Sequence, residues 1–303
     1  MQKNRRFPEK IISHLLGLGL VLLLAACDLP ASPKTSFWDA EDYFKGKAVE
    51  LADAAAQGDA KAIKRLMKEE GVNPDTTFSE GAMPLLAWPI LTESPEGLKA
   101  MLENGANPTA RWPTPTIVNF KDGSKGVYYE NNAMVMAAGW PDPQYLKLLL
   151  EHGGDPNTEN SNSESLLFQA WIKQRQWPNI QLLIEHGANI NESNGGGDYN
   201  TVASWYSDYS NFDKVYWLLE HGADPSLRLY AGPGGIHPPE GSMIIAENIY
   251  WLPAYPEMIP WQRKCQHWLR DHGIKRADKI PERLRQHRKG LELPTDENDI
   301  PLL

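Results

Sequence analysis

An acidic residue followed by a histidine closes four segments of this 303-residue chain, and these pairs are its best candidates for acid–base or metal chemistry. The histidines are His152, His186, His221 and His272. Carboxylates and neutral imidazoles are common general bases and common ligands of zinc. A catalytic or metal site would require several of these groups to converge on one point.

The placement of the four histidines argues against such convergence. They occupy equivalent places in successive helical segments. Packed helices lie about 8–10 Å apart, so the imidazoles form a ladder instead of a cluster. A histidine in the last turn of a helix can bond to an unpaired carbonyl and interacts favourably with the helix dipole. The sequence therefore predicts a structural role for these histidines, with no catalytic residue and no metal site.

Other catalytic signatures are absent from the sequence. It contains no Gly-x-Ser-x-Gly, phosphate-binding loop or His-Glu-x-x-His motif. The glycine run at 195–197 has no lysine after it, which a phosphate cradle requires. Two cysteines, Cys27 and Cys265, are too few for a disulfide framework or a metal set. We predict that the protein is not an enzyme and needs no cofactor.

The segments that carry the histidines share a closing motif, written Leu-Leu-Glu-His-Gly-Ala-Asp-Pro at 218–225. It describes a helix that ends at a glycine able to take positive φ and then turns through a short polar corner. Successive closing glycines are separated by 34, 48, 34, 35 and 51 residues. Three spacings lie near a period of about 33 residues, and the other two are that period with an insertion. The glycines are Gly71, Gly105, Gly153, Gly187, Gly222 and Gly273.

This pattern resembles the ankyrin repeat, in which a short inner helix, an outer helix and a finger form one unit. The resemblance covers roughly residues 47–275 and implies an all-α, ankyrin-repeat solenoid of about six helical hairpins. Of the family's opening Thr-Pro-Leu-His motif only Pro84-Leu85 is present, so another helical-hairpin solenoid is the alternative. The Gly-Ala-Asp/Asn-Pro corners favour the ankyrin architecture.

Two insertions interrupt the repeats. In residues 110–131, two β-prone stretches flank Asp122-Gly123, which predicts a β-hairpin that extends one finger. The second insertion covers residues 227–241 and 251–260 and is rich in glycine, proline and aromatic residues. Long loops in a compact array are usually functional or disordered, and the aromatic residues argue against simple disorder.

Residues 1–26 are predicted to be a signal peptide. A basic start precedes an apolar stretch, 11–26, that is too short for a comfortable membrane span. The sequence Leu-Ala-Ala-Cys at 24–27 resembles the lipobox of bacterial lipoproteins. The resemblance implies that Cys27 is acylated and becomes the new N-terminus. An ordinary cleaved signal with an incidental cysteine is the alternative.

The residue after the lipobox bears on location. In enterobacterial lipoproteins, an aspartate such as Asp28 is associated with retention at the inner membrane. Residues 27–46 are then a lipidated tether and lead-in, and the body lies on the periplasmic side of the bacterial inner membrane. Cys265 is left without a partner and is predicted to be a small buried hydrophobe in the last repeat.

Residues 276–303 are predicted to be a capping helix followed by a loose tail. The stretch 277–288 is basic with Pro281 near its start, and 292–303 is acidic with two prolines. A polar segment suits this place, because an end repeat needs a polar outer face.

Composition and fold together predict the class of partner. The net charge of −9 argues against nucleic acid, whose phosphates need a basic face. It favours a basic protein partner, although acidity that serves only solubility is the alternative. By the ankyrin resemblance, the protein binds other proteins through its fingers and the exposed side of its inner helices.

Aromatic residues near those surfaces are candidates for partner contact, because aromatic side chains are enriched at interfaces. Packing between repeats is the alternative for each of them, most strongly for tryptophans on inner helices. The candidates are Trp112, Tyr128 and Tyr129 in the first insertion, Trp140, Trp171 and Trp205 on or just after inner helices, and Tyr230 and Trp251 near the second insertion.

Ankyrin-repeat lipoproteins of this size resemble the periplasmic immunity proteins that accompany phospholipase effectors of type VI secretion systems. The resemblance implies a membrane-anchored protein that binds and neutralises a secreted antibacterial, lipase-type effector. A lipid anchor, a divergent array and an acidic surface suit the capture of an enzyme that arrives at the membrane from outside. The alternative is a periplasmic scaffold or assembly factor for an envelope complex.

Overall fold

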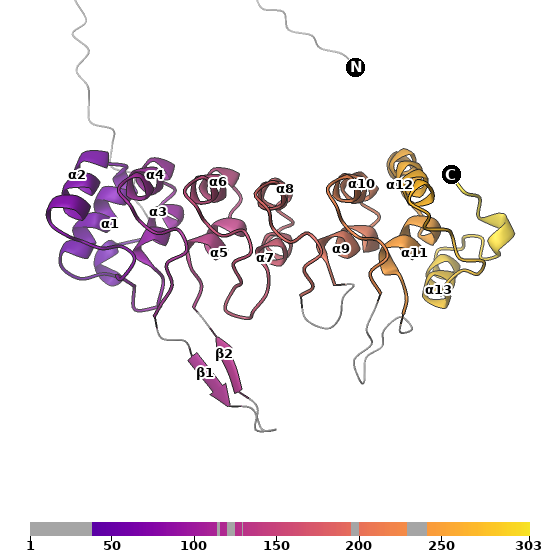
Figure 1. Cartoon of the computed structure of the whole chain (residues 1–303), viewed down its shortest axis with the longest axis horizontal. Helices are drawn as coiled ribbons and strands as arrows, with labels where there is room; N and C mark the ends of the chain where they lie inside the picture. The colour runs from indigo at the N-terminus through magenta and orange to yellow at the C-terminus, as the bar shows by residue number, and fades with distance from the viewer. Residues whose placement is uncertain (1–37, 114–115, 120–124, 129, 195–199, 229–240) are drawn as a thin grey trace, which may run out of the picture. The chain divides into compact units, whose positions relative to one another are not determined.

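In the computed structural model, residues 38–113, 116–119, 125–128, 130–194, 200–228 and 241–303 are described. These residues form six helical hairpins stacked in chain order (Figure 1), each an inner helix followed by an outer helix. The inner helices are α1 (Lys47–Gln57), α3 (Trp88–Leu91), α5 (Ala133–Ala138), α7 (Leu166–Ile172), α9 (Val202–Asp208) and α11 (Ile244–Trp251). The outer helices are α2 (Ala60–Lys64), α4 (Pro95–Glu103), α6 (Pro143–Glu151), α8 (Trp177–Glu185), α10 (Phe212–Glu220) and α12 (Ile259–Asp271).

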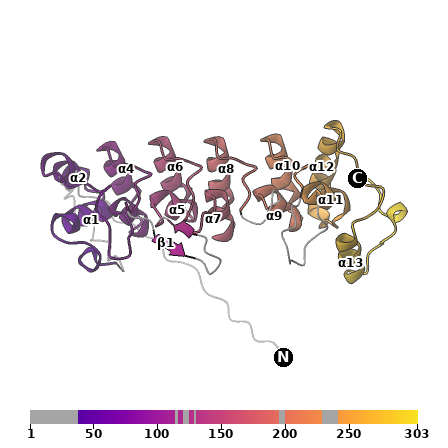
Figure 2. The same ribbon diagram turned by 60° about the horizontal axis from the view of Figure 1, so that its bottom comes forward.

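Neighbouring hairpins contact one another through like helices. The inner helices touch in series from α1 to α11, and outer-helix contacts include those of α4 with α6 and of α6 with α8. From both directions the outer helices form one row and the inner helices another (Figure 2). The core between the rows is aliphatic and fully buried, as at Leu51, Leu98, Leu146, Leu183 and Leu218. This is the repeat architecture that the glycine spacing predicts.

Polar N-caps start three of the short inner helices, α5, α7 and α9. The side-chain oxygens of Asn132, Ser165 and Thr201 accept hydrogen bonds from the backbone N–H three residues later, at the beginnings of α5, α7 and α9. Each cap contributes about 1 kcal/mol. Helices of six or seven residues are otherwise too short to be stable, so capping and packing together maintain them.

The four histidines cap the ends of outer helices. In each case Nδ1–H donates to the carbonyl four residues earlier, over 2.8 Å at His152, 2.8 Å at His186, 2.7 Å at His221 and 2.8 Å at His272. The glycine that follows each of them has positive φ, for example +92° at Gly187. The hydrogen bonds to helix-end carbonyls that the sequence predicts for these histidines are present.

Asparagine and aspartate link successive finger corners. The Asn157 side-chain oxygen accepts from the Asn189 backbone N–H over 2.8 Å, and the Asn191 oxygen accepts from Asp224 N–H over 2.9 Å. Asp75 accepts from Asn107 N–H in the same way over 2.8 Å. We refer to these bonds as the corner ladder. Each rung joins one repeat to the next, so the ladder fixes the spacing between fingers.

The first insertion contains two short strands, β1 (Thr116–Asn119) and β2 (Lys125–Tyr128). They pair antiparallel, with Thr116 opposite Tyr128 and Asn119 opposite Lys125. The pair leaves the stack on the side of the inner helices (Figure 1). The residues that connect the strands, 120–124, lie outside the described residues.

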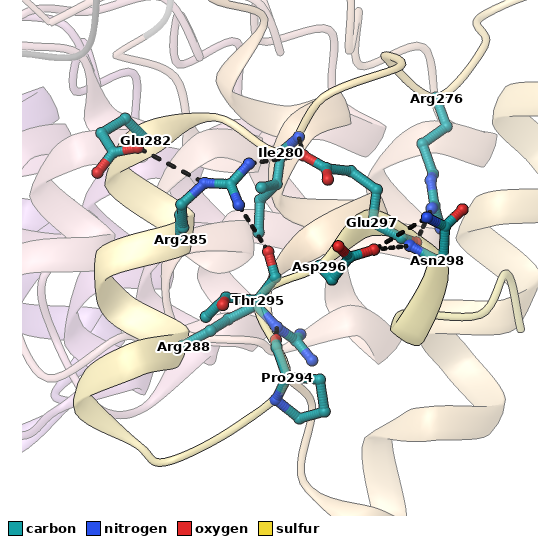
Figure 3. A network of polar contacts seen from close by, with 10 residues as sticks. All are labelled: Arg276, Ile280, Glu282, Arg285, Arg288, Pro294, Thr295, Asp296, Glu297 and Asn298. Carbon is teal, nitrogen blue, oxygen red and sulfur yellow. Dashed lines mark hydrogen bonds and ion pairs between the residues drawn. The ribbon is translucent and has the colours of Figure 1, made fainter.

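The C-terminal segment, which contains α13 (Glu282–Gly290), is held together by a polar network (Figure 3). Arg288 in α13 also donates to the Trp251 carbonyl of the last repeat over 3.1 Å. Arg285 pairs with Glu297 over 2.6 Å, and Glu297 also accepts from the Ile280 backbone N–H over 3.0 Å. Arg276 donates to the carbonyls of Ile300 and Glu297 over 2.7 and 2.9 Å. The prediction of a loose tail was wrong, because arginines tie the acidic segment down through backbone carbonyls and one carboxylate.

Candidate protein-binding surface

Two of the predicted contact residues belong to the core. Trp251 is 1% exposed at the end of α11, and the guanidinium of Arg276 lies over its ring at 3.9 Å. Trp205 is 9% exposed within α9. Both therefore fill space inside the protein, as the packing alternative predicts, and neither presents a ring at the surface.

The remaining candidates divide between the first finger and the turns after inner helices. Trp112 is 36% exposed and packs edge-on against Phe78 at 5.0 Å. Trp140 and Trp171, which end or follow inner helices, are half-buried. Tyr128 lies in β2, but its side chain is outside the described part of the structure. Tyr129 and Tyr230 are outside it altogether, as are Cys27 and Asp28.

Trp171 belongs to a cluster of rings between the α7–α8 and α9–α10 hairpins, which we call the aromatic junction. Its ring lies 4.9 Å from that of Tyr206 and 5.8 Å from that of Trp205. Trp177 continues the cluster toward Tyr206 and Trp217, at 5.2 and 5.3 Å. Edge-to-face and offset contacts of this kind add to the stability gained by burial. The members are Phe168, Trp171, Trp177, Trp205, Tyr206, Tyr209 and Trp217.

A tight turn at the end of α7 brings a cation to this junction. Gln174 and Arg175 both have left-handed backbone, with φ of +65° and +55°. Backbone bonds from Arg175 N–H to Trp171 O and from Gln176 N–H to Ala170 O, both 2.9 Å, hold the turn. Left-handed non-glycine residues cost roughly 1 kcal/mol or more each, so packing must stabilise the turn.

The Arg175 guanidinium lies 4.9 Å from the centre of the Trp171 ring and 4.2 Å from that of Tyr209. Such cation–π contacts position the side chain without using its N–H donors. Tyr209 is 55% exposed and Ile172, on the same turn as Arg175, is 58% exposed, so exposed apolar side chains accompany the cation. We call the group Trp171, Ile172, Lys173, Arg175 and Tyr209 the turn patch.

Lys173 is the second cation of the turn patch. Its stem runs so close to Gly139 that a Cβ built there would lie 2.9 Å from Lys173 Cγ. The glycine therefore allows α5 and the turn patch to approach. Among the described residues neither Lys173 nor Arg175 makes an ion pair, whereas Lys214 in α10 pairs with Asp213 over 3.4 Å. The turn patch thus presents two uncompensated positive charges on an acidic protein.

Groups with perturbed pKa values lie apart from this surface. Burial raises the pKa of the Cys265 thiol, which is fully buried as predicted, so thiolate chemistry is suppressed there. Burial also raises the pKa of the Tyr206 hydroxyl. Burial is the main cause of the raised pKa of Asp208, opposed by a 2.7 Å hydrogen bond from Asn248 and by the charge of Arg283. These groups serve packing, and the described residues hold no cluster of three or more potential metal ligands.

Sequence reasoning selected Trp171 but missed Arg175, Ile172 and Tyr209. Nothing in Lys-Gln-Arg-Gln at 173–176 indicates a left-handed turn, because such turns usually contain glycine or asparagine. One signal was available. Tyr209 follows an inner helix as Trp140 does in an earlier repeat, and a large aromatic residue at that place is unusual for a solvent-exposed turn.

Comparison with known proteins defines the class of fold. No family model matches the chain. The crystal structure of the ankyrin repeat domain of Bcl-3 aligns with a TM-score of 0.52 and 20% identity, covering 77% of this chain and 90% of that one. An ankyrin repeat protein, EF0377, aligns with a TM-score of 0.46 and 22% identity over 61% of this chain and 87% of its own. At 20% identity the Bcl-3 domain shows the fold alone: the chain has the ankyrin-repeat fold.

The chain is also similar in sequence to a curated bacterial protein. Protein PhlB of Serratia liquefaciens is 29% identical over 168 residues, which cover 53% of this chain and 62% of that protein. The match therefore spans less than two thirds of the relative's length.

None of the helices in the described ranges is both long and apolar enough to cross a membrane.

Proposed function

We propose that the protein is a protein-binding module that neutralises a secreted antibacterial effector of the lipase type. The observation that supports binding is the turn patch, where exposed apolar surface occurs on a repeat scaffold together with two cations that form no ion pair with any described residue. Aromatic residues and arginine are the residues most enriched at interaction hot spots. The lipase-type effector as partner comes from the resemblance to periplasmic immunity proteins.

The first finger is a second candidate contact. Ile117 in β1 is 60% exposed, and Trp112 at the base of the insertion is 36% exposed. A two-stranded hairpin is at best marginally stable by itself, so a partner that packed on it would stabilise it. We propose that the extended finger and the turn patch engage the same partner.

A direct test uses the purified full chain and the effector encoded beside it. The full chain is expected to bind that effector and to block its lipase activity in a stoichiometric titration. Substitution of the turn-patch residue Tyr209 by Ala should weaken binding, whereas the distant surface substitution Arg263→Gln should not. An effector that fails to bind at micromolar concentrations would refute the proposed partner.

We also propose that the protein is lipid-anchored on the periplasmic side of the bacterial inner membrane. The support is the lipobox that ends at Cys27, with Asp28 after it. Several acyl chains on one cysteine would anchor firmly, because each buried methylene contributes about 0.8 kcal/mol. Cys27→Ala should release the protein into the soluble periplasmic fraction or leave uncleaved precursor. Lipid label on that variant would show the anchor to be elsewhere.

The second candidate is a periplasmic scaffold or assembly factor, which the same binding surface would also serve. Deletion of the gene distinguishes an immunity protein from a scaffold. Cells that lack an immunity protein grow normally when the toxin is absent and die when it is delivered. Cells that lack a scaffold show an envelope defect without any toxin.

A further inference from the structure

We propose that the turn patch binds an acidic segment of the partner that also carries an apolar side chain. A carboxylate would pair with Arg175 and Lys173, and the apolar side chain would cover Ile172 and Tyr209. This inference rests on the proposed protein-binding function and gives the chemistry of the partner at this surface.

The stacking of Arg175 is the first argument. Its guanidinium lies over Trp171 and Tyr209, at 4.9 and 4.2 Å from the ring centres. A cation–π contact uses none of the N–H donors of the guanidinium, which stay available to bind a carboxylate with two parallel bonds. No ion pair uses these donors among the described residues. A carboxylate is the protein group that matches both the charge and the geometry.

Charge distribution is the second argument. The net charge of −9 by itself favours a basic partner. The turn patch differs, because Lys173 and Arg175 are exposed and form no ion pair within the part of the chain that the structure describes, while Lys214 is paired with Asp213. On a protein of net negative charge, an acidic segment is attracted to this pair of exposed cations, which helps to fix where the segment binds.

The exposed apolar side chains of the turn patch favour a ligand that has apolar groups as well as a negative charge. Tyr209, whose ring lies beneath the guanidinium, is 55% exposed, and Ile172, three residues before Arg175 in the chain, is 58% exposed. Covering both removes apolar surface from water and also shields the ion pair, which strengthens it. A peptide segment that combines carboxylates with aliphatic or aromatic side chains satisfies both requirements.

Preorganisation is the third argument. The backbone of Gln174 and Arg175 is held in a left-handed conformation by the bonds to Ala170 and Trp171. The stem of Lys173 packs on Gly139, which restricts it before any partner arrives. Side chains that are already ordered lose little entropy on binding, so affinity increases.

The experiment titrates the full chain with two acetylated decapeptides by calorimetry. One peptide alternates aspartate with leucine, and the other replaces each aspartate by lysine. The acidic peptide is expected to bind, more weakly as salt rises, and the basic peptide is not. Arg175→Gln should weaken binding about tenfold or more, since a charge-assisted pair is lost. Arg175→Lys should have an intermediate effect, because charge is kept without the fork.

The matched control is Arg263→Gln on α12, which removes another exposed arginine and should leave the titration unchanged. Equal binding of both peptides, absence of binding by the acidic peptide, or indifference to Arg175→Gln would each overturn the inference. Failure of the proposed function looks different. In that case the effector does not bind the full chain, yet the acidic peptide still binds in a way that depends on Arg175.

Discussion

The corner ladder and the aromatic junction join neighbouring repeats by opposite means. At the corners, short polar side chains reach one backbone N–H each, as Asn157 does to Asn189 and Asn191 to Asp224. At the junction, seven large rings fill the space between the α7–α8 and α9–α10 hairpins. The ladder depends on hydrogen-bond geometry, whereas the junction depends on buried apolar area.

This difference explains why the candidate surface lies at the junction. The side-chain oxygen of a corner asparagine or aspartate is already occupied by its bond to the next repeat. These short polar side chains also expose little apolar surface. Large rings that fill a junction extend beyond it, so Tyr209 is exposed while Tyr206 beside it is buried. Those exposed rings then stack with Arg175. In this array, the candidate binding surface occurs where the aromatic side chains between two hairpins are too large to be buried completely.

The largest effect is expected from Tyr206→Ala. Tyr206 is 1% exposed and contacts the rings of Trp171 and Trp177, so its loss should cost about 3–5 kcal/mol in the free energy of unfolding. Its buried hydroxyl has no hydrogen-bond partner in the described structure, so Tyr206→Phe should cost almost nothing. Urea unfolding measures both. Equal losses for the two substitutions would mean that the hydroxyl, not the ring, holds the junction.

A smaller effect is expected at the corners. Asn157→Ala removes the 2.8 Å bond from Asn189 N–H and a 3.4 Å bond to Gly187 O, which should cost about 1 kcal/mol in the same assay. Asn162, exposed in the same connection between α6 and α7, makes no side-chain hydrogen bond among the described residues and provides the control Asn162→Ala. If both variants were equally stable, the ladder would contribute nothing and packing alone would set the repeat spacing.

The smallest effect is expected from the histidine caps. His186→Ala removes one exposed bond to Leu182 O and should cost about 0.5 kcal/mol, seen as a small fall in Tm. Partner binding should be unchanged, because the bond lies at an outer-helix end. Loss of binding in this variant would restore the histidines as functional residues.

The repeat architecture could be predicted because its signals are local. A closing glycine, a corner asparagine and an apolar helix face each act within a few residues of the chain, so their period was visible at Gly153, Gly187 and Gly222. The role of Cys265 as a buried residue could be predicted in the same way, from its place in the last repeat.

The turn patch could not be predicted, because it depends on contacts between repeats. Arg175 and Tyr209 are 34 residues apart in sequence and meet only after α9 packs on α7. The buried state of Trp251 is also non-local, since it depends on a C-terminal segment that Arg276 and Arg288 hold in place. The composition of the C-terminal segment indicated only that it is polar and contains prolines. It did not indicate that arginines bind the acidic part of that segment.

The same C-terminal network makes attachment of the chain end sensitive to acid. Hydrogen bonds from Ile280 N–H, then from its own backbone and Arg285, lower the pKa of Glu297 from 4.5 to about 2. A pKa lowered by folding stabilises the folded state above the ordinary pKa, and that stabilisation disappears as pH falls toward 2. Amide protection of residues 297–303 should therefore decline between those pH values. Glu297→Gln should hold protection at its low-pH level at every pH, whereas Glu257→Gln should keep the pH dependence. Attachment of the chain end to the last repeat would then be controlled by protonation of one carboxylate.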